Sequence, residues 1–247
     1  MTEIGLPANV TACLFDLDGV LTPTALVHAA AWKETFDTFL RHRDGEGFRP
    51  FDATEDYDEY VDGRPRADGV RSFLASRDIE LPEGEDDDPP TRASVHGLGN
   101  SKNITVLEKI RTQGVQPYPG SVRYLEAVRA AGLKTAVVSS SANCRDVLVS
   151  AGIEHLLDVR IDGGTAKERG LRGKPKPDTF LEAASDLGFK PDQAAVFEDA
   201  LVGMDAGRAG RFGYVVGVDR VGQADALRAH GADTVVKDLA DLIGVTV

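Results

Sequence analysis

Short apolar runs alternate with amphipathic segments along most of the chain. Six of these runs have the length and residue types of buried strands: 10–15, 133–138, 158–161, 194–197, 213–218 and 234–236. Five other segments have the apolar spacing of helices: 121–131, 143–151, 179–187, 201–209 and 224–230. Strands that alternate with helices form a parallel sheet covered on both faces, so we predict an α/β fold with a doubly wound parallel sheet.

The stretch at 23–113 differs from the rest because it lacks strand-like runs. Its apolar residues instead have helical spacing at 25–39, 70–75 and 104–110, and acidic or Gly/Pro-rich loops separate these segments. We therefore expect two domains, an α/β core formed by 1–22 and 114–247 and an α-helical domain inserted at 23–113. Adjacent carboxylates without fixed geometry repel one another, so we expect the acidic run within 83–88 to be a solvated loop rather than a metal site.

Composition narrows the class of protein. The chain has 247 residues, 42% of them hydrophobic, with 28 Lys and Arg against 40 Asp and Glu and a net charge of −12. This composition is that of a folded domain, and the absence of a Lys/Arg-rich block argues against nucleic-acid and membrane partners. Cys13 and Cys144 are too few for a disulfide framework and lie in or beside apolar runs, so we expect buried thiols. With only two isolated cysteines and no apolar stretch of membrane-spanning length, we expect a cytoplasmic protein. We also expect a monomer or weak homodimer whose partners are small molecules.

Two carboxylates follow the first predicted strand. Asp16 and Asp18 are one residue apart in a run of turn-forming residues. In such a loop both can face one pocket, one as nucleophile or metal ligand and the other as general acid/base. The pair alone does not establish catalysis, because similar pairs occur in ordinary loops and in metal-dependent glycosyltransferases.

Three further polar groups follow later strands or precede helices. Ser139 begins a Ser-Ser-Ser-Ala-Asn run whose hydroxyls and backbone N–H groups suit a phosphate, although an ordinary helix cap would need only one serine. Lys174 lies between turn residues, where it could equally be a solvated loop lysine. Glu198 and Asp199 directly follow the strand-like run at 194–197. The alternative role for the aspartate is an ordinary helix N-cap. Taken together with Asp16, these groups are the parts needed for phosphoryl transfer assisted by Mg²⁺.

In this order, the four motifs resemble those of the haloacid dehalogenase superfamily, and the helical insert resembles the α-helical cap of some of its members. The resemblance implies a Rossmann-like core in which Asp16 is the nucleophile and Asp18 the general acid/base. It also implies that Ser139 and Lys174 hold the transferring phosphoryl group. The implied ligands of Mg²⁺ are Asp16, the backbone carbonyl of Asp18, Glu198 and Asp199.

Within the insert the resemblance extends to the β-phosphoglucomutase family. The segment 22–33 is similar to the start of that family's cap, 62–66 to its specificity loop and 101–103 to its second cap contact. Two departures are Pro23, where many relatives have an acidic residue, and Ala142, where the family pattern has a lysine. The resemblance implies the following substrate-binding residues: His28, Trp32, Arg66, Lys102, Ser140, Ser141 and Asn143.

Each cap residue also has a structural alternative. His28 and Trp32 lie four residues apart, as on the buried face of any helix, and Arg66 could be an ordinary surface residue. The resemblance nevertheless implies interconversion of β-D-glucose 1-phosphate and glucose 6-phosphate through an aspartyl phosphate and glucose 1,6-bisphosphate. Arg66 and Lys102 favour this over a Mg²⁺-dependent sugar-phosphate phosphatase, because a mutase must hold two phosphates and exclude water. A non-catalytic Mg²⁺-binding regulatory module would have no need of Asp18.

Overall fold

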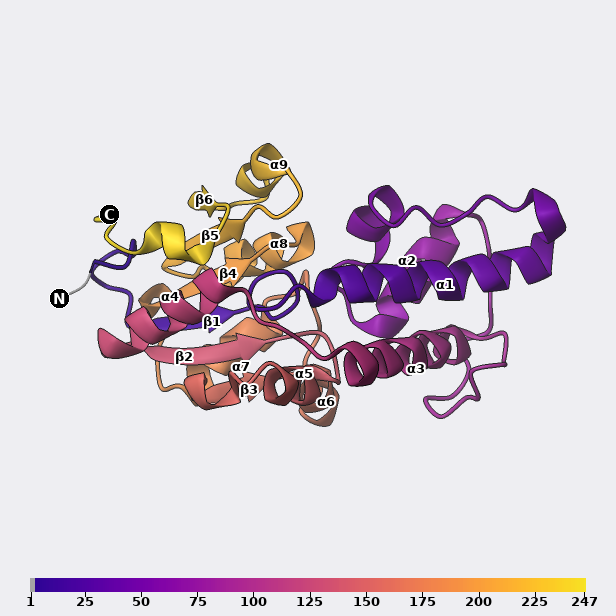
Figure 1. Cartoon of the computed structure of the whole chain (residues 1–247), viewed down its shortest axis with the longest axis horizontal. Helices are drawn as coiled ribbons and strands as arrows, with labels where there is room; N and C mark the ends of the chain where they lie inside the picture. Colours follow the sequence, from indigo (N-terminus) through magenta and orange to yellow (C-terminus); the bar gives the residue numbers. More distant parts are fainter. Residues whose placement is uncertain (1–2) are drawn as a thin grey trace. The chain divides into compact units, whose positions relative to one another are not determined.

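The computed structural model describes residues 3–247, which divide into two compact units (Figure 1). The core unit comprises the chain up to Pro23 together with Val115–Val247, and the helical unit is Thr24–Gly114. All six strands lie in the core unit: β1 (Ala12–Phe15), β2 (Lys134–Val138), β3 (Val159–Ile161), β4 (Ala194–Glu198), β5 (Tyr214–Val218) and β6 (Thr234–Val236).

The sheet is entirely parallel and has the strand order β3-β2-β1-β4-β5-β6. The chain builds outward from β1 in both directions, so β1 lies at the point where the strand order reverses. In open parallel sheets, ligands bind at the carboxyl ends of the strands beside this point. The observed sheet confirms the predicted doubly wound fold, and it places the loop after Phe15 between the loops after β2 and β4.

Six helices accompany the sheet: α4 (Pro119–Ala130), α5 (Cys144–Ser150), α6 (Gly163–Glu168), α7 (Asp178–Asp186), α8 (Leu201–Ala209) and α9 (Ala224–Ala229). Short helical turns occur at η3 (Glu154–Leu156), η4 (Pro191–Gln193) and η5 (Leu239–Leu242). Five of the helices confirm the periodic pattern. Helix α6 was not predicted, because its six residues include two glycines and carry no apolar period.

Aromatic residues show that both faces of the sheet are covered. Tyr124 of α4 packs edge-on against Phe15, which stacks on Phe197 with ring centroids 4.4 Å apart. Adjacent strand residues point to opposite faces, and Leu14 belongs instead to the cluster that contains Phe180 of α7. Helices α4 and α7 therefore pack on opposite faces. Among residues 3–247, no helix is both long and apolar enough to cross a membrane.

The helical unit consists of α1 (Thr24–Asp44), α2 (Arg66–Ser76) and α3 (Val95–Gln113), with helical turns at η1 (Gly45–Gly47) and η2 (Tyr57–Val61). Helices α1 and α3 are longer than predicted. The last turn of α1 is basic rather than apolar, which suits a helix C-terminus but leaves no periodic signal. Helix α3 begins early because the Ser94 hydroxyl accepts a hydrogen bond from the Gly97 amide at 3.0 Å.

One expectation for this unit, the solvated acidic loop, holds except at one residue. Most of the acidic run at 83–88 is exposed, as expected, but Asp88 is buried. Its carboxylate accepts hydrogen bonds from the Ser94 hydroxyl at 2.5 Å and from Arg92 at 2.7 Å. Asp88 is therefore part of the structure that begins α3, and the expected fully solvated loop does not exist at this residue.

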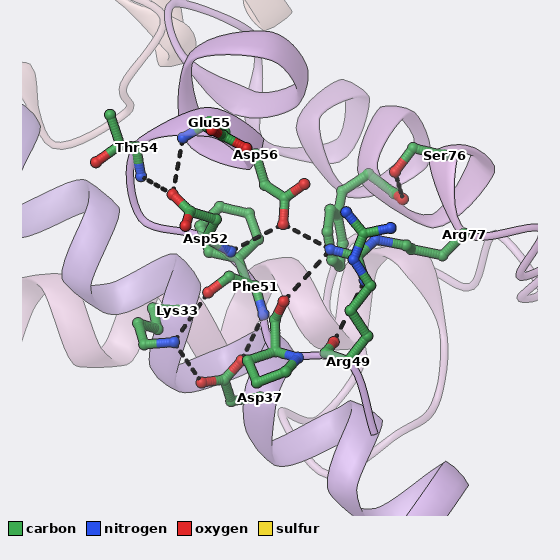
Figure 2. Close-up of polar contacts among 12 residues, drawn as sticks. Lys33, Asp37, Arg49, Phe51, Asp52, Thr54, Glu55, Asp56, Ser76 and Arg77 are labelled. Carbon is green, nitrogen blue, oxygen red and sulfur yellow. Dashed lines mark hydrogen bonds and ion pairs between the residues drawn. The ribbon is translucent and has the colours of Figure 1, made fainter. Parts of the chain in front are cut away.

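A buried ion pair fixes the long loop after α1 (Figure 2). Arg77 lies 2.6 Å from the Asp56 carboxylate, and the two side chains are only 9% and 8% exposed. Asp56 also accepts the backbone N–H of Asp52 at 2.8 Å, and Arg77 donates to the Arg49 carbonyl at 3.3 Å. The guanidinium lies 5.0 Å from the centre of the Phe73 ring. This network joins the end of α2 to the loop that precedes η2.

We expect this pair to stabilise the helical unit strongly. Removing one partner of a buried ion pair leaves the other charge uncompensated, so Arg77→Ala should lower the free energy of unfolding by about 3–5 kcal/mol. Arg71, on the same helix, pairs with Asp68 and Glu83, and its side chain is 45% exposed. Arg71→Ala should therefore cost less than about 1 kcal/mol.

The chain's single tryptophan, Trp32, lies in the helical unit, so its fluorescence during urea unfolding reports on that unit. Equal losses of stability in the Arg77→Ala and Arg71→Ala variants would show that the buried pair has no special role.

Candidate active site

The carboxyl ends of β1, β2 and β4 bring polar groups together, as the strand pattern predicted. Asp16 directly follows β1, and its backbone N–H donates to the Phe197 carbonyl of β4 at 2.9 Å. Glu198 is the last residue of β4, and Asp199 follows it. Ser139 follows β2, with its backbone N–H bonded to the Ile161 carbonyl at 3.0 Å. The sheet thus positions all four residues from regular backbone.

Lys174 lies at the centre of this group. Its ammonium is hydrogen-bonded to the Asp16 carboxylate and lies 2.5 Å from the Glu198 carboxylate and 3.2 Å from the Val138 carbonyl. The side chain is 1% exposed, so the alternative of a solvated loop lysine is wrong. The ring of Phe180 lies on another side, with its centre 5.0 Å from the ammonium nitrogen.

Burial governs the protonation of the cluster. Burial raises the pKa of Asp16 to about 6, against the opposing charge of Lys174, and Asp18 adds to the increase. Burial likewise raises the pKa of Glu198 to about 7, again opposed by Lys174. Although burial alone would lower the pKa of Lys174, the two carboxylates raise it above its ordinary value. Lys174 is therefore a fixed positive charge.

Three carboxylates of this cluster fit a hard divalent cation. Asp16, Glu198 and Asp199 are all buried, and each offers an oxygen within 4.8 Å of the others. With one ammonium against three carboxylates, the cluster has room for further positive charge, and oxygen-only donors suit cations such as Mg²⁺. The second Glu198 oxygen accepts the backbone N–H groups of Asp199 and Ala200, both at 3.1 Å, which fixes its orientation.

Gly19 is a residue whose role the sequence analysis missed. It has a positive φ of 88° and follows Asp18, which is half-buried and forms a backbone bridge to Thr22. A Cβ atom at Gly19 would lie 1.7 Å from a carboxylate oxygen of Asp199. Only glycine permits both this backbone conformation and this close approach.

Backbone N–H groups order the serine-rich turn after β2. The Ser141 amide donates to the Ser139 hydroxyl, and the Asn143 amide donates to the Ser141 hydroxyl, both at 3.1 Å. The turn, which includes Ser140, leads into α5 at Cys144. Burial raises the pKa of the Cys144 thiol, and the charge of Asp18 adds to the effect. Cys13 and Cys144 are both free and buried, as expected.

The helical unit brings together three of the predicted substrate residues. The Lys102 ammonium lies 2.7 Å from Nδ1 of His28 and 4.8 Å from the centre of the Trp32 ring. Burial and the Lys102 charge hold the pKa of His28 well below its ordinary value, so the imidazole is neutral. Lysine can only donate, so Nδ1 accepts and the proton is on Nε2. Trp32 also stacks on Phe36 at 4.9 Å, and its packing role is therefore evident.

Arg66 is the first residue of α2 and is partly buried. A Cβ atom at Gly99 of α3 would lie 3.2 Å from its Cγ atom, so the glycine makes room for the arginine side chain. Burial lowers the pKa of Arg66, and the charge of Asp86 opposes this shift. The aliphatic part of the Arg66 side chain thus packs against Gly99 of α3.

Comparisons with known proteins agree with this geometry. Residues 10–211 match the family model of haloacid dehalogenase-like hydrolases, and the chain belongs to this family. It is 57% identical over 246 residues to β-phosphoglucomutase of Mycobacterium bovis, covering 97% of this chain and 94% of that protein. It is 32% identical to β-phosphoglucomutase of Bacillus subtilis, covering 94% and 91%. A crystal structure of β-phosphoglucomutase from Clostridium difficile matches with a TM-score of 0.75 and 27% identity, over 94% of this chain and 93% of that one.

We predict that Gly19→Ala disrupts the carboxylate cluster. Gly132 provides a matched control, because its φ is 87° and open space surrounds its Cα atom. Both substitutions strain the backbone by about 1–2 kcal/mol, but only Gly19→Ala also displaces the Asp199 carboxylate. Calorimetric titration with a divalent cation should therefore show binding weakened about 10-fold or more in Gly19→Ala and unchanged in Gly132→Ala. Equal affinities in the two variants would contradict this account.

Proposed function

We propose that the chain interconverts β-D-glucose 1-phosphate and glucose 6-phosphate. The observation that carries the proposal is the buried cluster of Asp16, Lys174 and Glu198 at the end of β1. A carboxylate in contact with a buried lysine and beside further acidic groups is suited to accept a phosphoryl group. Relatives named β-phosphoglucomutase, at up to 57% identity over nearly the full length, support this choice of substrate.

Asp16 is the proposed nucleophile of one half-reaction and, once phosphorylated, the phosphoryl donor of the other. When its carboxylate oxygen attacks the phosphorus at C1 of glucose 1,6-bisphosphate, the bond from phosphorus to the C1 oxygen breaks. Asp18 donates a proton to that oxygen, which releases glucose 6-phosphate and leaves phosphorylated Asp16. When β-glucose 1-phosphate binds next, Asp18 removes the proton of its 6-hydroxyl group, which attacks the phosphoryl group on Asp16 and re-forms the bisphosphate. General acid/base assistance of this kind contributes about 10²–10⁴-fold to the rate.

The proposed cation is Mg²⁺, bound by Asp16, Glu198, Asp199 and the Asp18 carbonyl. When bound, it would neutralise charge on the phosphoryl oxygens. Lys174 supplies a second, fixed positive charge to the same oxygens, and the Ser139 hydroxyl and the backbone N–H groups of its turn donate hydrogen bonds to them.

Other residues are proposed to bind the remainder of the substrate. Arg66 would bind the phosphate that is not being transferred, together with the side chains of Ser141 and Asn143. His28 and Lys102 would contact the sugar, with the neutral imidazole donating through Nε2. The lysine of the family pattern is replaced by Ala142, so Arg66, Arg64 or Arg145 would have to supply the positive charge for this phosphate.

A time course by phosphorus NMR tests the function directly. The enzyme is mixed with β-glucose 1-phosphate, Mg²⁺ and a catalytic amount of glucose 1,6-bisphosphate. We expect glucose 6-phosphate to accumulate with little inorganic phosphate, because phosphorylated Asp16 reacts with the sugar hydroxyl rather than with water. Release of inorganic phosphate at the rate of substrate loss would identify a sugar-phosphate phosphatase instead.

Mg²⁺ should stabilise the protein in a pH-dependent way. Because burial raises the pKa of Asp16 and Glu198, the metal-free native state binds these protons more tightly than the unfolded chain does. Their contribution to stability therefore falls as the pH rises from about 4 to about 7. Mg²⁺ competes with these protons, so its stabilising effect should grow over the same range. At one hundred times its Kd the gain should be about 3 kcal/mol at pH 8.

Calorimetric melting temperatures with and without Mg²⁺, at pH 5 and pH 8, measure this effect. The Asp199→Ala variant serves as the control and should lose most of the increase. An increase of the same size at both pH values, or one retained in Asp199→Ala, would contradict the proposed site.

Arg66→Ala should separate isomerisation from phosphorylation of the enzyme. Loss of a guanidinium–phosphate contact costs about 2–4 kcal/mol, which corresponds to an isomerisation rate lower by about 30- to 1000-fold. Phosphorylation of Asp16 by acetyl phosphate involves no second phosphate and should change little. Arg71→Ala, at an exposed position on the same helix, is the matched control. If both reactions of Arg66→Ala fall equally, or neither falls, Arg66 does not bind the second phosphate.

A further inference from the structure

The loop between β5 and α9, residues 219–223, contains none of the proposed catalytic residues. It nevertheless donates hydrogen bonds to two loops of the proposed site, the loop after β1 and the loop after β4. Nε of Arg220 donates to the Gly19 carbonyl at 2.9 Å, and Nη2 lies 3.4 Å from the Val20 carbonyl. The side-chain amide of Gln223 donates to the Asp199 carbonyl at 3.0 Å. One loop thus contacts the backbone next to Asp18 and the backbone of a proposed metal ligand.

Arg220 is itself held on several sides. Nη1 donates to the Lys237 carbonyl at 2.8 Å, and the guanidinium carbon lies 3.8 Å from the centre of the Tyr118 ring. The side chain is 16% exposed. Hydrogen bonds from a charged donor are about twice as strong as those between neutral groups. A guanidinium fixed in this way can therefore hold the Gly19 peptide group in one orientation.

Tyr118 extends this support to the end of the core unit's first segment. Its backbone N–H donates to the Leu21 carbonyl at 2.9 Å, just before the core unit's first segment ends at Pro23. The Ser121 hydroxyl donates to the Val20 carbonyl at 2.7 Å. The arginine and these two residues thus contact successive peptide groups of the turn that follows Asp18.

Gln223 is fixed by its own turn. The Asp219 carboxylate accepts the backbone N–H groups of Gly222 at 2.7 Å and Gln223 at 2.8 Å. The Asp219 amide in turn donates to the Val236 carbonyl of β6 at 2.8 Å. The position of the Gln223 side chain is therefore tied to the sheet.

We propose that Arg220 and Gln223 are positioning residues that hold the loop of Asp18 and Gly19 in register with Asp199. The need for such positioning follows from the close approach of Gly19 to the Asp199 carboxylate, where a shift of either loop alters the carboxylate cluster. The inference rests on the proposed function only for its kinetic consequence. The expected effect on the order of the loop does not depend on the proposed function.

The kinetic test compares Arg220→Ala, Gln223→Ala and the control Arg228→Ala. Arg228 lies on α9 and pairs with Asp225, and its side chain is 56% exposed. A displacement of about 1 Å at a reacting group can cost about 100-fold in rate, so Arg220→Ala should lower kcat by about 10- to 100-fold while KM changes less than about 3-fold. Gln223→Ala should act in the same direction, and Arg228→Ala should match the wild type. Millimolar guanidinium, well below denaturing concentrations, should restore part of the activity of Arg220→Ala.

Hydrogen exchange provides a readout that needs no substrate. The amides of Leu21 and Thr22 both donate to the Leu17 carbonyl at 3.0 Å, so their exchange reports the order of this turn. We expect them to exchange about 10-fold faster or more in Arg220→Ala, while the amides of β3 are unchanged. If Arg220→Ala does not fold, the kcat and the apparent Mg²⁺ affinity of Gln223→Ala test the positioning role.

Wild-type kcat and unchanged exchange in these variants would overturn the inference. A general loss of protection that includes β3, with no rescue by guanidinium, would also overturn it by showing a purely structural role. If the wild-type enzyme does not isomerise β-glucose 1-phosphate, the proposed function fails. Faster exchange confined to the turn would still support the positioning role.

Discussion

The structure depends on keeping several carboxylates buried around one lysine. Moving a charge out of water costs several kcal/mol unless a partner of opposite charge and hydrogen bonds replace the solvent. Lys174 meets this need for Asp16 and Glu198 together. The arrangement requires β1 and β4 to be neighbours, with Phe15 beside Phe197, so that the next residue of each strand reaches the same ammonium. The geometry of the site therefore depends on the strand order of the sheet.

Glycine makes this density of charge geometrically possible. Gly19 brings the backbone after Asp18 against the Asp199 carboxylate, and a Cβ atom at Gly203 of α8 would lie 2.0 Å from the Glu198 carboxyl group. Glu198 at the end of β4 and Asp199 directly after it are thus both packed against residues without side chains. Preorganised charge of this kind is worth more in a buried site than in water, because no solvent has to reorganise during the reaction. The crowding of buried charge that would destabilise a carboxylate cluster by itself is also what makes the cluster useful for the reaction.

Most strands and helices of the core unit could be predicted from the sequence. Each strand appears as a short apolar run, and the polar residues that follow three of these runs include Asp16, Ser139 and Glu198. The short helix α6 lacks apolar periodicity and could not be found in this way. Neither could the contact of Arg220 with Gly19, because the two residues are 201 positions apart and no local pattern links them.

The helical unit was less predictable for a physical reason. Its helices pack around an apolar cluster that includes Phe36 and Phe73, but its long loops are held by isolated polar contacts such as Arg77 with Asp56. The burial of Asp88 likewise depends on Ser94, six residues away in a loop that looks solvated. The choice of a glucose phosphate as substrate rests on resemblance at His28, Arg66 and Lys102 and on the relatives, since the chemistry of the core is common to many phosphoryl acceptors.

The central claim is that the lysine-bound carboxylate after β1 accepts the phosphoryl group. The most direct measurement is to incubate the enzyme with acetyl phosphate and Mg²⁺, reduce the acyl phosphate with borohydride and locate the modified residue by tandem mass spectrometry. We expect conversion of Asp16 to homoserine, with no modification at Asp18 or Asp199. Modification of a different carboxylate, or phosphate retained on Ser139 with Asp16 unmodified, would contradict it.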